Sequence, residues 1–311
     1  MKDVSVIIIN YNTSKLTIEC IESIRKYTQG ISYEIVVVDN DSQHDDQRHL
    51  LKQDKDIIYI QSKENLGFGR ANNLGLLKAE GEYILFLNSD TLLKNNALKI
   101  MVDFARAYEG NLGGLGAILT NRVGERIHSY GSLLKMSNDW NDLVLNPLKK
   151  ALHLYKEPII QWPSKYMKVG YVTGADLLVK RCVLDTCGGF SPSFFMYCEE
   201  TEMQHRFKDN GYDNILMNGP EIIHLEGECS KRAGMSLFLR STLRQQRSQY
   251  IYFKLTEPRW KYYVYRIIHP LLRQTMWLNP HASFKDKWRL MKVLFCKVKL
   301  IKSEDYNEYI G

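Results

Sequence analysis

In two short segments of this chain, a run of apolar residues leads directly into carboxylate side chains. Leu85–Asp90 is an apolar run that stops at an aspartate, and Phe195–Glu202 runs from aromatic side chains into three glutamates. A carboxylate at the end of a buried strand suits a divalent metal, and such a metal suits a diphosphate leaving group. A second acidic cluster can supply a base that activates a hydroxyl nucleophile. Together the two segments predict displacement at a nucleotide sugar.

Each of these features also has a plainer interpretation. Asn88 to Asp90 could be the N-cap of a helix, where Asp and Ser are common. Glu199, Glu200 and Glu202 could simply stabilise the helix that they begin, through a favourable interaction with its dipole. The apolar residues before them would partly desolvate a nearby carboxylate and raise its pKa toward neutral, which favours a base. His224 follows two isoleucines and is either a metal ligand or an ordinary strand-end histidine.

The first part of the chain alternates apolar runs with amphipathic segments. Such a pattern predicts βαβ units and a largely parallel sheet covered on both faces. The predicted strands are Val4–Ile9, Glu34–Val38, Ile57–Ile60, Tyr83–Leu87, Leu115–Leu119 and Tyr171–Val179. The predicted helices cover Ala71–Ala79, Thr201–Asp209, 236–256, 260–278 and 284–302, and 133–168 looks like an irregular insertion.

Four polar residues fall at or just beyond the predicted strand ends. In parallel sheets ligands bind at the carboxyl ends of strands, so Asn10, Asp39, Asn65 and Asp90 predict a binding site on one edge. Asp39 could accept a hydrogen bond from the N3–H of a pyrimidine base or could shape a turn.

The glycine-rich segment Gly67-Phe68-Gly69 also follows a predicted strand. It lacks the third glycine of the dinucleotide fingerprint. We read it as a loop passing close to a ligand, with Arg70 near the phosphates.

Composition describes an ordinary globular protein, with 44% hydrophobic and 25% charged residues in 311. The six cysteines form no CxxC pair, so reduced thiols in a cytosolic protein are expected. No signal-peptide pattern precedes Val4, and no apolar run is long enough to span a membrane. These features predict a cytoplasmic location.

The net charge of +7 is unevenly distributed. Residues 231–311 hold 17 basic and 5 acidic residues, whereas 1–230 hold 25 and 30. We therefore predict a catalytic domain over 1–230 and a basic, aromatic-rich helical extension over 231–311. Basic amphipathic helices with Trp and Phe suit a membrane surface, and a homodimer interface is the other option. No nucleic-acid-binding signature is present, so no nucleic-acid partner is expected.

From about residue 3 to 230, and weakly to about 255, the chain resembles the family 2 glycosyltransferases of the GT-A fold. It is most similar to rhamnosyltransferase-like bacterial members that build surface polysaccharides. Segments in the family's order carry the resemblance: Val4–Asn12, Val36–Ser42, Asn65–Gly75, Leu87–Thr91, Gly174–Arg181, Gly188–Phe190, Phe194–Arg206, Gly211-Tyr212 and His224–Ser230.

The resemblance implies a metal-dependent, inverting transfer from a nucleoside diphosphate sugar, with Mn²⁺ or Mg²⁺ as cofactor. Asp90 and His224 would bind the metal, and Glu200 would be the base, with Glu199 as the alternative. Asp176 and Glu202 would lie on the acceptor side. The implied nucleotide contacts are Asn10, Tyr11, Asn12, Asp39, Asn65, Gly69, Arg70, Asn73 and Asn88.

The resemblance favours thymidine diphosphate rhamnose as donor, with a uridine diphosphate sugar as the alternative. The acceptor would be a saccharide, lipid-linked, at the inner face of the cytoplasmic membrane. A nucleotidyltransferase acting on a sugar phosphate is the competing enzyme. The glycine-free segment Asn10–Lys15 counts against it, because such enzymes place a glycine-rich loop after the first strand. A non-catalytic scaffold with the same fold is the third reading.

Overall fold

The computed structural model describes residues 1–141, 145–146, 149, 152–154, 160–225, 235–273 and 284–301. Parts of the predicted insertion 133–168 therefore lie outside the described residues. The same holds for the predicted domain boundary at 230, for the last residues of the segment His224–Ser230 and for the end of the helix 260–278.

Strands and helices alternate through the first ninety residues, as their apolar patterns predict. The β-branched runs form strands buried on both faces, and the segments between them form helices with one apolar face. The elements are β1 (Val4–Asn10), α1 (Ser14–Tyr27), β2 (Tyr33–Asp39), α2 (Arg48–Gln53), β3 (Ile58–Gln61), α3 (Phe68–Leu76), β4 (Tyr83–Asn88) and β5 (Thr91–Leu93).

The following segment, up to His224, adds strands on the other side of β4. Its elements are α4 (Ala97–Ala107), β6 (Leu112–Thr120), β7 (Tyr130–Gly131), α5 (Met136–Trp140), β8 (Tyr166–Val169), β9 (Tyr171–Val172), β10 (Asp176–Lys180), α7 (Arg181–Cys187), α8 (Glu199–Asp209) and β11 (Asp213–His224). The predicted single strand Tyr171–Val179 is wrong. It is two strands, β9 and β10, and each joins a different sheet.

The main sheet has nine strands, eight of them in the order β3-β2-β1-β4-β10-β6-β11-β5, with β8 beside β11. Strands β1, β2, β3, β4, β6 and β11 run in one direction, and β10, β5 and β8 run against them. The chain therefore has the predicted mixed, mostly parallel sheet. After β3 it crosses back over β1 to β4, so the strand order reverses between β1 and β4. Ligands bind at such a reversal.

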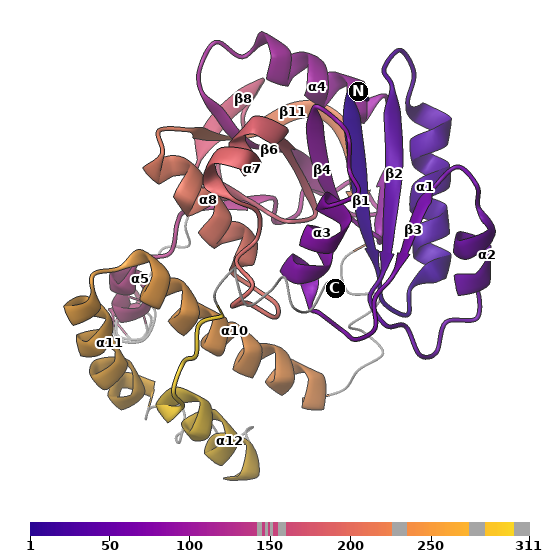
Figure 1. Cartoon of the computed structure of the whole chain (residues 1–311). Helices are drawn as coiled ribbons and strands as arrows, with labels where there is room; N and C mark the ends of the chain where they lie inside the picture. Colours follow the sequence, from indigo (N-terminus) through magenta and orange to yellow (C-terminus); the bar gives the residue numbers. More distant parts are fainter. Residues whose placement is uncertain are drawn as a thin grey trace.

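Helices cover both faces of this sheet (Figure 1). One core packs α1 and α4 against one face through residues such as Ile24 and Met101, and the other packs α3, α7 and α8 against the opposite face through residues such as Ala71 and Phe207. The connection from β1 to β2 through α1 and the connection from β3 to β4 through α3 run in opposite directions along the sheet. Because both crossovers are expected to be right-handed, α1 and α3 lie on opposite faces.

Three further helices, α10 (Met235–Thr256), α11 (Arg259–Leu272) and α12 (Phe284–Phe295), pack together around a third core. Tyr250, Phe253, Tyr265 and Leu294 fill this core, and Phe194 from the loop before α8 inserts into it. In Figure 1, α10 runs beneath the edge where the parallel strands end. No helix in the described part of the chain is both long and apolar enough to cross a bilayer.

Candidate active site

A cavity of about 280 Å³ lies at the reversal between β1 and β4. Its walls come from the ends of these two strands, from the loop before α3, from Phe195 and Met196, and from Arg244 of α10. A small cavity with a few convergent polar groups at a strand-order reversal is a typical ligand site.

Asn88, Asp90 and His224 form one corner of this site. Asn88 ends β4, and His224 ends β11, where it pairs with Thr91 of β5 in the sheet. The His224 ring nitrogen Nε2 lies 3.2 Å from Asp90 Oδ1 and 3.3 Å from Asn88 Nδ2. The amide of Leu225 donates to the Asp90 carbonyl at 2.8 Å, so backbone contacts fix the aspartate beside the imidazole. Residues 134 positions apart in the chain thus meet, as the sequence predicts.

These side chains form a suitable donor set for a divalent cation. One carboxylate, one imidazole and one amide suit Mn²⁺ or Mg²⁺ when phosphate oxygens or water supply the remaining ligands. Among the described residues, no group of three or more His, Cys, Asp or Glu side chains could hold a metal by itself. The arrangement therefore fits a cation that binds together with a diphosphate, held by Asp90 and His224.

The acid pair sits at the first turn of α8, after a tightly bent loop. Tyr197 and Cys198 both adopt left-handed backbone conformations, with φ of 74° and 65°. Consecutive non-glycine residues with positive φ are rare and costly, and they concentrate at functional sites. The bend turns the chain sharply into α8 and places Glu199 and Glu200 side by side.

Burial separates the two glutamates of the pair. Glu199 is only 3% exposed, and within the described chain its Oε2 has no hydrogen-bond partner, whereas Glu200 is partly exposed. Burial, reinforced by repulsion from Glu200, raises the pKa of Glu199 to about 8. Burial also raises the pKa of Glu200. Glu199 is thus predominantly protonated at neutral pH, and Glu200 is the better placed of the two to exchange protons with a ligand.

A backbone contact joins the loop before α3 to the loop before α8. The amide of Phe68 donates to the carbonyl of Phe195 at 3.0 Å. Gly67, at φ 78°, lies so close that a Cβ on it would be 2.0 Å from that carbonyl oxygen. Only glycine fits both the conformation and the space. This contact brings Phe195 and Met196 into the wall of the cavity.

The acid pair lies next to the Asn88 corner without lining the same cavity in the described structure. Ala175 connects the two, because its carbonyl accepts the Asn88 amide at 2.9 Å. A Cβ on the neighbouring Gly174 would lie 3.6 Å from Glu200 Cβ and 3.2 Å from the Phe68 ring. The two predicted groups therefore share one edge of the sheet, where the turn Gly174-Ala175 lies between them.

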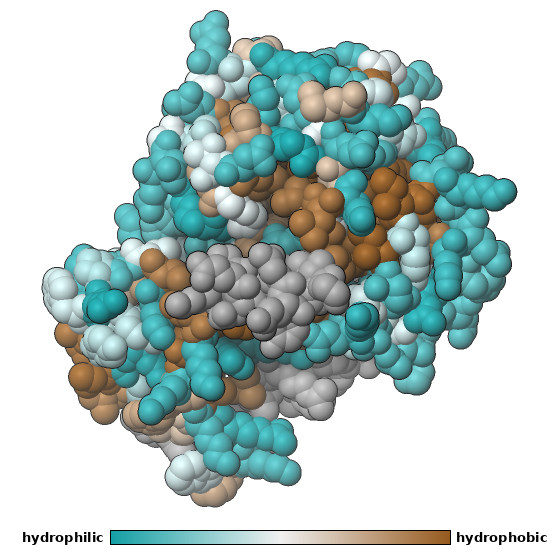
Figure 2. Space-filling view, viewed as in Figure 1, coloured by the Kyte–Doolittle hydropathy of each residue, from teal (hydrophilic) through white to brown (hydrophobic). Residues whose placement is uncertain are grey.

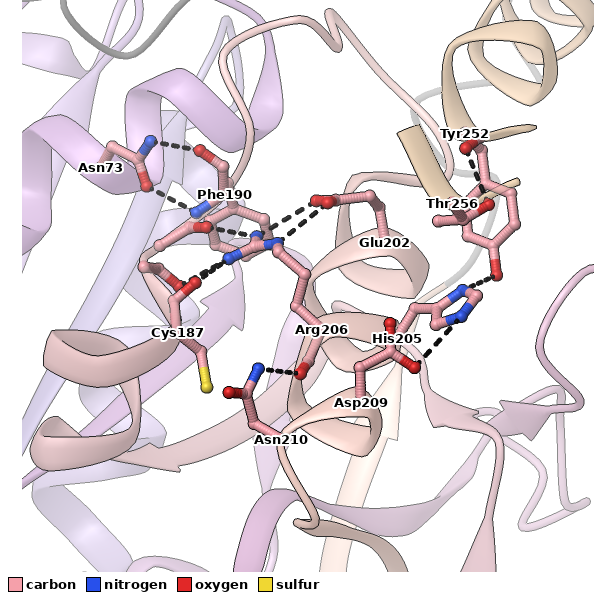
Figure 3. A network of polar contacts seen from close by, with 12 residues as sticks. Asn73, Cys187, Phe190, Glu202, His205, Arg206, Asp209, Asn210, Tyr252 and Thr256 are labelled. Atoms are coloured by element: carbon pink, nitrogen blue, oxygen red, sulfur yellow. Dashed lines mark hydrogen bonds and ion pairs between the residues drawn. The ribbon is translucent and has the colours of Figure 1, made fainter. Parts of the chain in front are cut away.

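A polar network behind the acid pair fixes α8 (Figure 3). Glu202 pairs with Arg206 through both oxygens, at 2.9 and 3.1 Å, and Arg206 also donates to the carbonyls of Cys187, Gly188 and Gly189. The carboxylate of Glu202 is therefore engaged on the side of the 187–189 turn. Its placement favours a structural role over the predicted contact with the acceptor.

Asn73 clamps the same loop from α3. Its side chain donates to the Phe190 carbonyl at 2.7 Å and accepts from the Phe190 amide at 3.0 Å (Figure 3). Gly69 belongs to this packing too, because a Cβ on it would lie 3.0 Å from Phe190 Cβ and 3.5 Å from Glu199 Cβ. The structure thus places both predicted nucleotide contacts, Gly69 and Asn73, against the loop at Phe190.

Several other predicted ligand contacts are internal in this structure. Asp39 is fully buried and accepts hydrogen bonds from Asn10, Gln61 and the Ser42 amide. Asn10 is equally buried, and Asn12 uses its side-chain oxygen to accept two amides of the β2–α2 loop. These residues shape the loops beside the cavity, and a base would reach Asp39 only by replacing one of its present partners.

Asp176 lies inside the sheet, opposite Leu87 of β4, and is fully buried. Its Oδ2 accepts the Ala117 amide at 2.6 Å, and burial raises its pKa to about 7. An acceptor on the surface could not contact it, so the predicted acceptor role for Asp176 is not supported by its position.

Tyr11 and Asn65 line the cavity, as predicted. Arg70, predicted near the phosphates, lies on α3 and is not among the described residues of the lining. Arg244 supplies a cation there instead, with its guanidinium 5.0 Å from the Phe195 ring centre. Arg244 was missed because only the fold brings α10 against the cavity, and the resemblance is weak between 230 and about 255. The signal for it in the sequence was the basic character of residues 231–311.

A larger cavity of about 1080 Å³ lies elsewhere, with His205, Lys208 and Tyr212 in its wall. None of the predicted site residues lines it in the described chain. We place the site in the smaller cavity, because the chemistry-bearing residues converge there.

Comparison with known proteins identifies relatives of this chain. The family model described as "Glycosyl transferase family 2" matches residues 5–167. An "Uncharacterized glycosyltransferase" of Rickettsia bellii is 37% identical over 138 residues, 43% of this chain and 19% of that protein. The "N-acetylglucosaminyl-diphospho-decaprenol L-rhamnosyltransferase" of Mycobacterium tuberculosis is 21% identical over 212 residues, 64% of this chain and 68% of that protein. The first curated relatives, from Rickettsia and Streptococcus pneumoniae, are matched over only 17% to 33% of their length.

Solved structures share the fold. S. aureus TarS superposes with a TM-score of 0.54 at 15% identity, covering 94% of this chain and 48% of TarS. The mannosyltransferase PcManGT from Pyrobaculum calidifontis, described in complex with GDP-Man and Mn²⁺, gives 0.53 at 18% identity and covers 93% of this chain and 78% of its own. At these identities the likeness concerns the fold alone, and the predicted GT-A fold is confirmed.

Replacing Gly67 by Ala tests the close approach of the two loops. The Gly67→Ala variant adds a clash with the Phe195 carbonyl to the cost of positive φ, so we expect unfolding to become easier by more than about 2 kcal/mol. Gly124 is the control: it has φ 82° and open space around a Cβ, so Gly124→Ala should cost only about 1 kcal/mol. Urea denaturation measures both. Equal losses in the two variants would contradict the contact between the loops.

Replacing Glu199 by Gln tests the raised pKa of its carboxyl. In the folded state this pKa lies near 8, above the ordinary glutamate value of 4.5, so folding favours the protonated acid. Wild-type stability should therefore be lost progressively as pH rises from about 4.5 to about 8. Glu199→Gln should melt higher than wild type by a margin that grows across this window, in thermal unfolding at pH 5, 6.5 and 8. The exposed Asp185→Asn serves as control, and a pH-independent margin for Glu199→Gln would contradict the assignment.

Proposed function

Because the chain belongs to glycosyl transferase family 2, we propose that it transfers a sugar from a nucleoside diphosphate sugar to a saccharide acceptor, with inversion at the anomeric carbon. The observation that carries this proposal is the corner of Asn88, Asp90 and His224 at the strand-order reversal. Asn88 and Asp90 line the same cavity as Arg244, and His224 contacts both of them, so a donor set for a divalent cation lies near a guanidinium. A leaving diphosphate requires this kind of positive surrounding.

In the proposed reaction the acceptor hydroxyl attacks the anomeric carbon on the face opposite the diphosphate. A new carbon–oxygen bond forms, and the electrons of the breaking bond pass to the β-phosphate. Mn²⁺ or Mg²⁺, when held by Asp90 and His224, would offset the charge on the diphosphate. Arg244 faces the same cavity and would neutralise a further part of that charge. The apolar walls of Phe68 and Phe195 would exclude water that competes with the acceptor.

We assign the base to Glu200. Its side chain is the partly exposed member of the pair, and burial raises its pKa, which makes its carboxylate a stronger base. The buried Glu199 would remain protonated, because ionisation of both neighbours would place two negative charges together. Neutral Glu199 would then leave Glu200 as the charged, proton-accepting carboxylate.

The donor and acceptor are proposed from the relatives and from the site. The rhamnosyltransferase named above supports thymidine diphosphate rhamnose as donor and a lipid-linked saccharide as acceptor, with a uridine diphosphate sugar as the alternative donor. The Mn²⁺ described with the structural neighbour supports Mn²⁺ as cofactor. The setting would be synthesis of a cell-surface polysaccharide at the cytoplasmic face of the membrane.

The experiment is incubation of the purified chain with Mn²⁺ or Mg²⁺ and a panel of nucleotide sugars, scored by donor hydrolysis and by transfer. Glu200→Gln should lower turnover by about 10²-fold or more, because a general base contributes roughly 10²–10⁴-fold, while nucleotide diphosphate binding is retained.

Asp90→Ala should weaken the Mn²⁺-dependent binding of nucleoside diphosphate measured by titration calorimetry.

Glu221→Gln is the matched control, because Glu221 is an exposed carboxylate three residues before His224. It should leave both measurements unchanged. Wild-type turnover in both Glu200→Gln and Asp90→Ala would rule out the assigned roles, and release of pyrophosphate from a nucleoside triphosphate would replace the proposed reaction.

Arg244 is tested against its neighbour on the same helix. Removing the guanidinium from the cavity in Arg244→Ala should raise the KM for the donor and lower turnover by about tenfold to a hundredfold, since charge-assisted hydrogen bonds to a phosphate are among the stronger polar contacts. Arg244→Lys should retain part of the activity. Arg247→Ala is the control, because Arg247 is exposed on α10 and does not line the described cavity. Equal effects of the two alanine variants on donor KM would remove Arg244 from the site.

A further inference from the structure

Helix α11 is apolar on two opposite faces. One face, with Tyr262, Tyr265 and His269, is buried against α10 and α12 in the third core. At 100° per residue, the opposite face carries Trp260, Tyr263, Val264, Ile267 and Leu271, and all five side chains are exposed. Trp260, Ile267 and Leu271 are each more than 60% exposed. In Figure 2 hydrophobic residues line the outer left edge, where α11 lies in Figure 1.

Helix α12 has a second stripe of this kind. Phe284, Trp288 and Phe295 are exposed and fall within about 40° of one another around the helix, while Leu294 is buried in the third core. Two adjacent helices thus each bury one face and expose aromatic and aliphatic side chains on another. Isolated exposed apolar residues are ordinary, but contiguous stripes of this kind mark an interaction surface.

Positive charge surrounds both stripes. From 259 to 300 the sequence has ten Lys and Arg residues and a single acidic residue, Asp286. Lys285, Lys287, Arg289 and Lys292 flank the aromatic stripe on α12. An apolar stripe bordered by Lys and Arg, with Trp and Tyr among its members, is the pattern of a helix that lies in the headgroup region of a bilayer.

We propose that the exposed faces of α11 and α12 seat this protein on an anionic lipid bilayer surface. The apolar side chains would enter the region between headgroups and acyl chains, while the Lys and Arg residues contact acidic headgroups. The excess of positive charge on these helices favours an anionic bilayer as the partner of this surface. A second copy of the chain would bring an equal excess of positive charge against the first, whereas an anionic bilayer compensates it.

This surface is connected to the candidate active site through α10. Arg244, in the cavity wall, and Tyr250, in the third core beneath α11, lie six residues apart on this helix, a rise of about 9 Å. Ser248, between them, donates to the Met196 carbonyl at 2.7 Å. On the premise of the proposed function, the helix would hold the donor cavity at a fixed height above the bilayer, where a lipid-linked acceptor is presented.

The test is co-flotation of the full chain with vesicles of phosphatidylcholine alone and with one third phosphatidylglycerol. Wild type should float with the anionic vesicles, less so with rising salt because exposed charges are screened, and much less with neutral vesicles. Ile267→Glu combined with Leu271→Glu should weaken binding to anionic vesicles at least tenfold, because two charges replace apolar anchors.

The double substitution Leu77→Glu with Val123→Glu is the matched control. Both residues are exposed aliphatic side chains outside the C-terminal helices, so the variant loses the same kind of surface and gains the same charge. It should bind as wild type does. Failure of the wild type to float with anionic vesicles would overturn the proposal, as would equal binding by the two double variants.

Sedimentation velocity separates the lipid surface from a self-interface. The proposal would be overturned if the wild type were a dimer, the α11 variant were a monomer, and neither floated with vesicles. That result would assign this face to a second copy of the chain. Donor hydrolysis without lipid should be equal in wild type and the α11 variant. Absence of hydrolysis in both, with flotation intact, would refute the proposed reaction and leave the membrane surface standing.

Discussion

The hydrogen bond from the Phe68 amide to the Phe195 carbonyl holds the candidate active site together. One partner belongs to the loop that follows the parallel strand β3, and the other belongs to the loop that leads into α8 and its acid pair. The contact requires glycine at 67, because any side chain there would meet the Phe195 carbonyl oxygen. Together with the contact between Asn88 and Ala175, it sets the position of the α8 glutamates relative to the cavity at the strand ends. A reaction that needs both a base and a leaving-group site depends on that relative position.

Acidic groups concentrate along this edge of the sheet, and their charge favours binding of a cation there. Asp90 lies in the corner with His224, and Glu200 lies across the turn Gly174-Ala175 from this corner. Glu199 and Asp176 are buried, and burial raises the pKa of both. Burial favours the neutral form of both carboxyls, which limits the repulsion that the folded protein must tolerate. The negative charge that remains at the surface favours a divalent cation, and a nucleoside diphosphate brings the additional oxygen ligands that Asp90 and His224 do not supply.

The sequence predicted the sheet and its strand ends, because parallel strands bring their carboxyl ends to one edge whatever their distance in the chain. The meeting of Asp90 with His224 was predicted from the family resemblance. The sequence did not predict which polar residues would face a ligand. Asn73, Glu202 and Asp39 have the residue types of a binding site, yet Phe190, Arg206 and Gln61 are their partners. Whether an amide or carboxylate binds a ligand or the protein depends on tertiary neighbours, which residue type and spacing do not specify. Arg244 was missed for the same reason, since only the fold brings α10 against Phe195.

Helix α10 contributes to both proposed surfaces, because its residues face in several directions. Arg244 faces the cavity, Ser248 donates to the loop before the acid pair, and Tyr250 packs beneath α11. The Tyr252 hydroxyl shares a hydrogen bond of 2.6 Å with the His205 ring of α8 (Figure 3). The C-terminal helices are therefore joined to the α/β part by polar contacts on both sides of the acid pair, and Phe194 adds an apolar contact by entering their core. A flexible tether would leave the active site free to rotate above a bilayer, whereas contacts of this kind fix its orientation. The basic extension is thus best understood as a wall of the site that also carries the surface for docking.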